Sequence, residues 1–124
     1  MILGIGIDLT KVSRYSAFLD NKGFLDKYFH SSEIEYVLSK GAGASQSLAG
    51  KFAAREAFFK ALGTGFNGFS PKDIEVSSDS VGKPIIIPND KVKNRLDSMA
   101  EGWKIHLTIS HEKEYAIAQV ILEA

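Results

Sequence analysis

The sequence predicts an α+β fold with an antiparallel sheet and packed helices, in one domain that spans residues 1–124. Short apolar segments of strand character lie at both ends of the chain, and helical periodicity fills much of the part between them. No repeat, low-complexity tract or linker divides the 124 residues, and a chain of this length buries roughly two-thirds of the surface it exposes when unfolded.

The composition excludes several classes of function. With 15 basic and 15 acidic residues the formal net charge is zero, so no global field gathers nucleic acid or an anionic membrane. The absence of cysteine excludes disulfides, a thiolate nucleophile and a Cys-ligated metal. No basic leader opens the chain, and no window approaches the roughly 20 apolar residues of a membrane span. We expect a cytoplasmic protein that meets anionic partners with local basic clusters.

The N-terminal segment Ile2–Leu9 has the length and the β-branched residues of a buried strand. Because side chains alternate along a strand, its odd-numbered apolar residues share one face, and Gly4, Gly6 and Asp8 lie on the other. That second face is nearly bare until Asp8.

Helices are expected after this strand. Residues 13–28 predict helical structure with a break at 21–23. The next segment predicts a short helix that begins with a capping box of Ser32 and Glu35. Residues 41–47 are rich in glycine and serine and predict a loop.

The C-terminal half predicts a hairpin over residues 74–87, with a glycine in its turn. A short surface helix capped by Asn89 follows it. Residues 103–110 alternate between apolar and polar side chains, as in a strand with one buried face, and residues 114–122 are apolar on both faces.

The longest predicted helix, residues 51–62, is apolar nearly all round but carries four charges. At about 100° per residue, Lys51 and Arg55 share one face, and Glu56 and Lys60 share another. Glu56 and Lys60 have the spacing of a simple helix ion pair. Lys51 and Arg55 are like charges one turn apart, which fits either a solvated helix edge or a bound anion.

Gly63 and Gly65 follow this helix. A glycine at this place is the ordinary helix cap, but glycines also let a backbone approach a ligand closely. The segment is no Walker loop, because no Gly-Lys-Ser or Gly-Lys-Thr follows.

Asp8 and Glu56 are carboxylates in otherwise apolar segments. Asp8 has two interpretations: it caps the next helix, or it joins Glu56 at a ligand. Two carboxylates suit Mg²⁺, which takes one or two of them together with waters and substrate phosphates. Lys60, one turn from Glu56, adds a cation for a diphosphate. His30 and His106 show no zinc-ligand spacing, and His111 follows a strand end, where it is either solvated or presented to a ligand.

Four segments carry a resemblance to a known family. GIGIDL near the N-terminus, KFAAREAFFKALGTG, the turn GKP and the C-terminal ISHEKEYAIAQV closely resemble the holo-[acyl-carrier-protein] synthases, the small bacterial type of 4'-phosphopantetheinyl transferase. The resemblance covers essentially the whole chain. It implies the 4'-phosphopantetheinyl transferase fold and transfer of the 4'-phosphopantetheine arm of coenzyme A to a serine of apo acyl carrier protein, in fatty acid biosynthesis.

The resemblance also implies roles for particular residues. Asp8 and Glu56 resemble the Mg²⁺ ligands, and with Lys60, the cation on the coenzyme A phosphates, they form the catalytic set. The expected coenzyme-binding residues are Lys51, Lys60, Gly63, Gly82, Lys83, Pro84 and His111.

The family further implies a homotrimer with active sites between subunits, so that one face of the long helix would meet a neighbour. Arg14, with Lys11 close by, resembles the arginine that binds the carrier protein; a solvated basic helix start is the other interpretation.

Two residues depart from the family pattern. Lys51 stands where relatives commonly have Arg, which keeps the charge but loses the bidentate fork. Arg55 stands where they usually have Lys, and packing or a subunit contact are both open for it.

Overall fold

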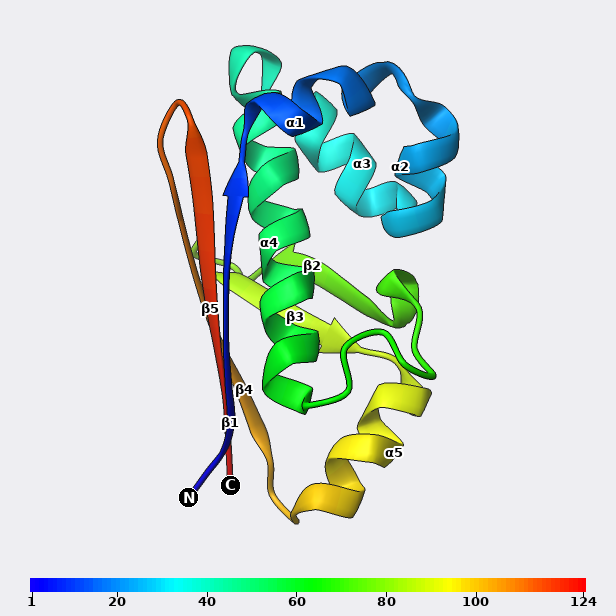
Figure 1. Cartoon of the computed structure of the whole chain (residues 1–124), viewed down its shortest axis with the longest axis vertical. Helices are drawn as coiled ribbons and strands as arrows, with labels where there is room; N and C mark the ends of the chain where they lie inside the picture. The colour runs from blue at the N-terminus through cyan, green and yellow to red at the C-terminus, as the bar shows by residue number, and fades with distance from the viewer.

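Two antiparallel sheets pack around one long helix in the computed structural model, which describes residues 1–124 (Figure 1). The first sheet has the strand order β1-β5-β4, and the second is the β2–β3 hairpin. The strands are β1 (Ile2–Lys11), β2 (Ile74–Ser78), β3 (Pro84–Pro88), β4 (Lys104–His111) and β5 (Tyr115–Glu123). The predicted α+β class, the hairpin and both C-terminal strands are therefore confirmed.

The central helix α4 (Ala44–Leu62) is longer than predicted. A loop was expected over residues 41–47, but only a 3-10 turn at Gly41–Gly43 precedes the helix. Ala44, Leu48 and Ala49 are at most 5% exposed. Packing against neighbouring helices therefore stabilises a first helical turn that the local sequence alone favours only weakly. The helix ends as predicted at Gly63, whose left-handed φ of 83° favours glycine.

The bare face of β1 is the face that α4 covers. A Cβ added to Gly4 would lie 2.0 Å from the carbonyl oxygen of Ala61, and one added to Gly6 would lie 1.8 Å from that of Ala57. Only glycine permits this approach, so the two glycines let the helix backbone lie directly on the strand.

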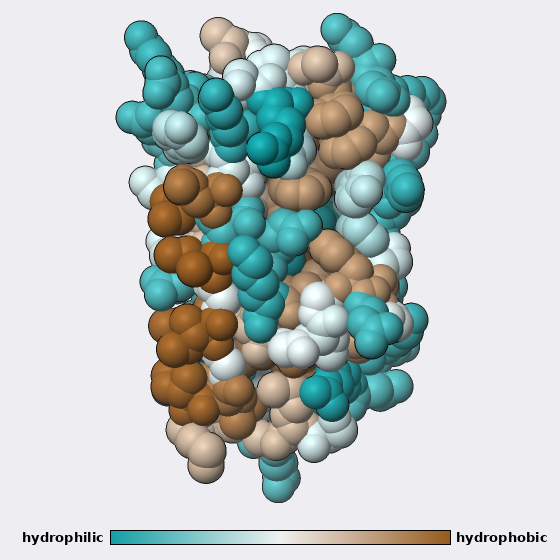
Figure 2. Space-filling model, viewed as in Figure 1, coloured by the Kyte–Doolittle hydropathy of each residue, from teal (hydrophilic) through white to brown (hydrophobic).

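The opposite face of β1 is exposed. Ile5, Ile7 and Leu9 are 60%, 52% and 64% exposed, and Tyr115 and Ile117 of β5 are 41% and 37% exposed. We call these five side chains the outer face. Figure 2 shows a column of apolar side chains on the side of the molecule where β1 lies in Figure 1.

The expectation that α4 meets a neighbour stays a prediction, and little of the helix surface is available for such a contact. Most of α4 is buried by its own chain: Ala53, Ala57 and Phe58 are 0% exposed. The unpartnered apolar surface belongs to the sheet and not to the helix.

Short helices cover the N-terminal end of α4 (Figure 1). They are α1 (Ser13–Ser16), the 3-10 turn Ala17–Asp20, α2 (Lys22–Tyr28) and α3 (Ser31–Leu38). The predicted break is confirmed, and the side chain of Asn21 accepts a bond from the N–H of Phe24 at 3.0 Å. No helix has the length and apolarity needed to cross a membrane.

The predicted capping box of Ser32 and Glu35 is not formed, so this prediction is wrong. Because α3 begins at Ser31, its third position is Glu33, whose carboxylate accepts from the N–H of His30 at 3.0 Å. Ser32 donates instead to Glu75 of β2 at 2.9 Å. The helix α5 (Asp90–Met99) begins as predicted, since Asn89 accepts from the N–H of Val92 at 3.1 Å.

Candidate functional site

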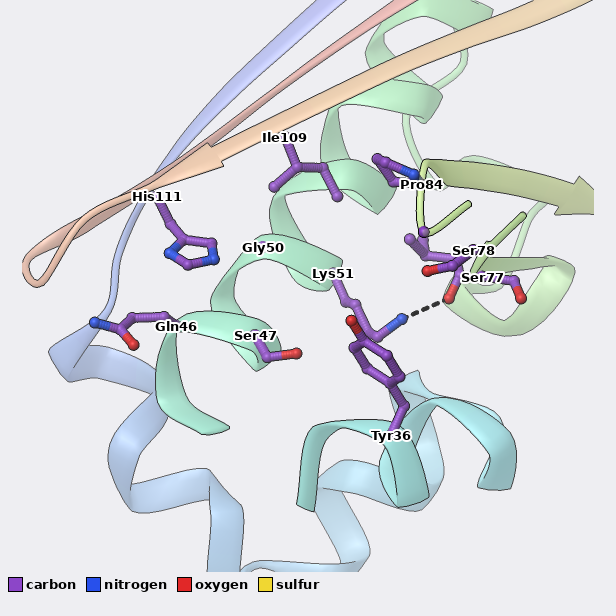
Figure 3. A pocket seen from close by; sticks show the side chains of 12 residues that line it. Tyr36, Gln46, Ser47, Gly50, Lys51, Ser77, Ser78, Pro84, Ile109 and His111 are labelled. Atoms are coloured by element: carbon purple, nitrogen blue, oxygen red, sulfur yellow. Dashed lines mark hydrogen bonds between the residues drawn. The ribbon is translucent and has the colours of Figure 1, made fainter. Parts of the chain in front are cut away.

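A cavity of about 190 Å³ opens between α4, the β2–β3 hairpin and the end of β4. Four residues named from the sequence line it: Lys51, Gly82, Pro84 and His111. Figure 3 shows Lys51 and His111 on opposite sides of this cavity, with Ser47 between them. We call it the Lys51 pocket; its further polar side chains are Tyr36, Gln46, Ser47, Ser77 and Ser78.

The side chain of Lys51 is buried, at 6% exposure. Its Nζ donates to the carbonyl oxygen of Val76 at 2.7 Å and lies 4.6 Å from the ring centre of Tyr36 (Figure 3). It forms no ion pair, so two of its three N–H donors remain for a ligand. Burial lowers the pKa of Lys51, and the negative charge of Glu33 opposes this.

The hairpin turn is fixed by a residue that sequence reasoning missed. One carboxylate oxygen of Asp79 accepts from the N–H groups of Val81 and Lys83, at 2.9 and 2.8 Å. Gly82 has a φ of 86°, which favours glycine. An aspartate three residues before Gly82 is the turn signal that could have revealed it. The turn brings Gly82 and Pro84 to the pocket, whereas Lys83 lines a separate cavity beside His106.

Asp8 and Lys60 form a second group among the site residues predicted from the sequence. Lys60 Nζ lies 3.2 Å from Asp8 Oδ1 and donates to the carbonyl oxygen of Ile7 at 2.9 Å. Thr10, which the sequence did not single out in this role, donates to Asp8 Oδ2 at 2.6 Å. Asp8 therefore does not cap α1, and Lys60 pairs with it and not with Glu56.

Glu56 completes this group. Burial raises the pKa of Glu56, the charge of Asp8 raises it further, and Lys60 opposes both. The negative charges of the two carboxylates therefore oppose each other, and a divalent cation would relieve that repulsion. No cluster of three or more His, Asp or Glu residues could hold a metal, so waters and substrate phosphates would complete the shell, as Mg²⁺ accepts. The donor set fits Mg²⁺.

Helix α1 lies next to these carboxylates. Burial raises the pKa of Tyr15, Arg14 opposes this, and the charges of Asp8 and Glu56 add to it. Arg14 and Lys11 are both exposed at this end of the molecule.

The structure does not bring all the named residues together. Glu56 lies about 140° around α4 from Lys51. Gly63 lies about 18 Å from Lys51 along the helix axis. The N–H of Gly63 bonds to the carbonyl oxygens of Phe59 and Lys60, as in an ordinary helix cap. One chain thus presents two groups: the Lys51 pocket, and the carboxylate group of Asp8, Glu56 and Lys60.

Arg55, which the sequence left open, joins neither group. It is 1% exposed and forms a buried ion pair with Glu33 of α3. Packing is therefore the interpretation that the structure supports.

Comparisons with a family model and with known proteins point to the same family. Residues 4–120 match the model of the 4'-phosphopantetheinyl transferase superfamily. A holo-[acyl-carrier-protein] synthase of Treponema denticola is 48% identical over 125 residues, which cover 99% of each chain.

Two solved structures share the fold. A holo-(acyl-carrier-protein) synthase from Bacillus anthracis in complex with CoA (3',5'-ADP) has a TM-score of 0.81 and 40% identity, covering 100% of this chain and 98% of that one. The Helicobacter pylori enzyme in complex with coenzyme A has a TM-score of 0.80 and 30% identity, covering 96% and 99%. The chain belongs to the 4'-phosphopantetheinyl transferase superfamily, within the holo-[acyl-carrier-protein] synthase family.

Proposed function

We propose that this chain transfers the 4'-phosphopantetheine arm of coenzyme A to a serine hydroxyl of apo acyl carrier protein, releasing adenosine 3',5'-bisphosphate. The observation that carries the proposal is the Lys51 pocket, where an α-helix, a hairpin turn and a strand end converge on residues of the family motifs. The relatives from Bacillus anthracis and Helicobacter pylori were solved with coenzyme A. No helix could span a membrane, and we place the reaction in the cytoplasm.

The adenosine end of coenzyme A would occupy the Lys51 pocket. The buried ammonium of Lys51 has two free N–H donors and no carboxylate partner, which suits a phosphate ester. His111 faces the same space and would contact this phosphate, while Gly82 and Pro84 would lie beside the adenine.

The diphosphate would lie at the carboxylate group. Asp8 and Glu56 would hold Mg²⁺, which when bound neutralises charge on the phosphate oxygens. Lys60 is half exposed and uses two of its N–H donors within the chain, so one remains for a phosphate oxygen. Thr10 would hold the Asp8 carboxylate in place through its hydroxyl.

In the transfer, the serine oxygen attacks the β-phosphorus and the bond from this phosphorus to the bridging oxygen breaks. The bridging oxygen leaves with adenosine 3',5'-bisphosphate, and the serine proton passes to a water. Lys60 would stabilise the charge that develops on the leaving phosphate. Glu56 is not the base in this scheme, because its carboxylate would hold the metal.

We further propose a homotrimer in which each active site combines two chains. The outer face exposes five large apolar side chains, which suits a contact with further copies. In a closed ring, the carboxylate group of one chain would meet the Lys51 pocket of the next. Arg14 in α1 and Lys11 at the end of β1, both exposed, would bind an acidic carrier protein near the carboxylates.

The experiment is to incubate the purified protein with coenzyme A, Mg²⁺ and apo acyl carrier protein, and to measure the intact mass of the carrier. A mass gain equal to one phosphopantetheine group, lost when Mg²⁺ is chelated, supports the proposal. Coenzyme A that binds without any mass gain would indicate a non-catalytic binding module.

A further inference from the structure

The backbone of β2 is bonded to charged side chains of α3 and α4. The carbonyl oxygen of Ile74 accepts from Arg55 Nη2 at 3.1 Å. At Val76, the N–H donates to Glu33 Oε2 at 3.2 Å, and the carbonyl oxygen accepts from Lys51 Nζ at 2.7 Å. Backbone groups at the edge of a two-stranded sheet would otherwise need water or another strand. Glu33 and Lys51 therefore bind the backbone N–H and the carbonyl oxygen of the same residue, Val76.

Glu33 has no freedom to move within this arrangement. It is 2% exposed, and its carboxylate accepts from the N–H groups of His30 and Val76 and from both terminal nitrogens of Arg55. Bidentate pairing of this kind fixes orientation as well as charge.

Arg55 is fixed in turn. Its Nε donates to the carbonyl oxygen of Pro71 at 2.9 Å, and its guanidinium lies 4.7 Å from the ring centre of Phe29. Each of its nitrogens has a partner within the chain and the residue is 1% exposed, so Arg55 does not reach a ligand in the pocket. The guanidinium ties α4 to the 3-10 turn (Pro71–Asp73) before β2 and to α3.

The charge of Glu33 also acts on Lys51. The charged groups that act on this ammonium are Glu33 on α3, Arg55 on α4, Glu75 on β2 and Lys40 just after α3, with His111 of β4 across the pocket. Burial lowers the pKa of Lys51; Glu33 is the largest influence that raises it, and Arg55 lowers it. If Glu33 lost its charge, the positive charge of the buried Arg55 would be opposed only by the weaker influence of Glu75.

We propose that Glu33 and Arg55 are positioning residues. Acting through the Val76 backbone, they orient the ammonium of Lys51 toward the phosphate ester of coenzyme A. This inference rests on the proposed function, because it assigns the ligand of Lys51 to that coenzyme. Arg55 fixes Glu33, Glu33 fixes the peptide of Val76, and the carbonyl of Val76 holds Lys51 with two N–H donors toward the cavity.

The test is a double-mutant cycle on coenzyme A affinity, measured by calorimetry without carrier protein. Lys51→Met is expected to weaken binding about tenfold or more, since it removes a charged hydrogen-bond donor. Glu33→Gln is expected to weaken binding about fivefold in the wild-type background and less than about twofold in the Lys51→Met background. An equal loss in both backgrounds, or no loss in either, would overturn the positioning role.

Two further measurements keep the test decisive. NMR titration of labelled lysines reports the pKa of Lys51 without any coenzyme, and Glu33→Gln is expected to lower it further; an unchanged value would contradict the inference. If Glu33→Gln does not fold, Glu33→Asp is used in the same cycle, because it keeps the charge but withdraws the carboxylate from Val76. The expected pattern is the same: Glu33→Asp weakens coenzyme A binding when Lys51 is present and does not weaken it in the Lys51→Met background.

The matched control is Leu96→Ala in α5. Leu96 is 0% exposed and lies in the core around α4 and the sheets, so its truncation lowers stability without touching Lys51. It is expected to leave coenzyme A affinity unchanged where the variant is folded. If Lys51→Met itself leaves binding unchanged, the proposed pocket is wrong, which is a different result from a failed cycle.

Discussion

Asp8 and His111 lie on opposite edges of one three-stranded sheet, with β5 between them and both side chains on the face that α4 covers. Their neighbours on β5 are Ala118 and Ala116, which are 1% and 0% exposed. The helix thus fills the space between the two side chains. This separation by α4 is the physical reason for proposing a site shared between chains.

Removal of either carboxylate should abolish transfer. Asp8→Asn and Glu56→Gln are expected to lower the rate of carrier modification on the order of 100-fold or more, because each removes charge that would hold Mg²⁺ at the diphosphate in the proposed site. The rate is measured from the intact mass of the carrier over time. Glu35→Gln, a change at an exposed carboxylate on α3, is the control and should keep full activity. Full activity in both site variants would remove the metal assignment.

The raised pKa of Glu56 predicts a pH-dependent stability. A carboxyl whose pKa is raised by folding contributes favourably below its unfolded pKa and loses that contribution as the pH rises through the raised value. Without divalent cations, Glu56→Gln should therefore raise the melting temperature at pH 8, and this gain should vanish toward pH 4. Thermal unfolding in a chelator measures it, and an equal gain at both pH values would contradict the cause.

Gly6 tests the contact between β1 and α4. A Cβ at Gly6 meets the backbone of Ala57, which cannot rotate away, so Gly6→Ala should lower the free energy of unfolding by about 3 kcal/mol or more. Gly23→Ala is the control, because its Cβ meets only the side chain of Asn21 at 3.6 Å within a helix, where alanine is favoured by up to about 1 kcal/mol. Urea unfolding compares them, and equal effects would refute the close approach.

Local patterns predicted much of this fold. The hairpin, the C-terminal strands and the caps at Asn89 and Gly63 depend on neighbouring residues, and their signals lie within a few positions. The first turns of α4 were missed because they depend on tertiary burial of Ala44 and Leu48, which no local signal reports.

The site was harder to predict where partners are distant in sequence. Lys60 has a carboxylate at i−4, yet it pairs with Asp8, 52 residues away. Arg55 and Glu33 are 22 residues apart on different helices, so nothing in either segment indicates their pairing. Periodicity separated the two faces of β1 but did not say which face α4 would cover, since that choice depends on the alanines of α4.

The outer face predicts assembly. Ile7→Glu places a charge among the exposed apolar side chains and should dissociate the protein to a smaller species that keeps its circular dichroism. Ile87→Glu, at a 44% exposed position on β3, is the matched control and should leave the mass in solution unchanged. Sedimentation of both variants measures it. A wild-type protein that sediments as a monomer at working concentration would contradict the trimer.

The most direct test of the account mixes two variants, each impaired in a different part of the proposed site. Asp8→Asn retains the Lys51 pocket and Lys51→Met retains the carboxylate group, so in mixed assemblies one interface in about four combines intact parts from two chains. After unfolding and joint refolding at equal amounts, and with coenzyme A well below saturation, transfer to the carrier should return to about a quarter of the wild-type rate, while each variant refolded alone stays well below that rate. If the mixture stays as inactive as its components while mixed assemblies form, the site is not shared between chains.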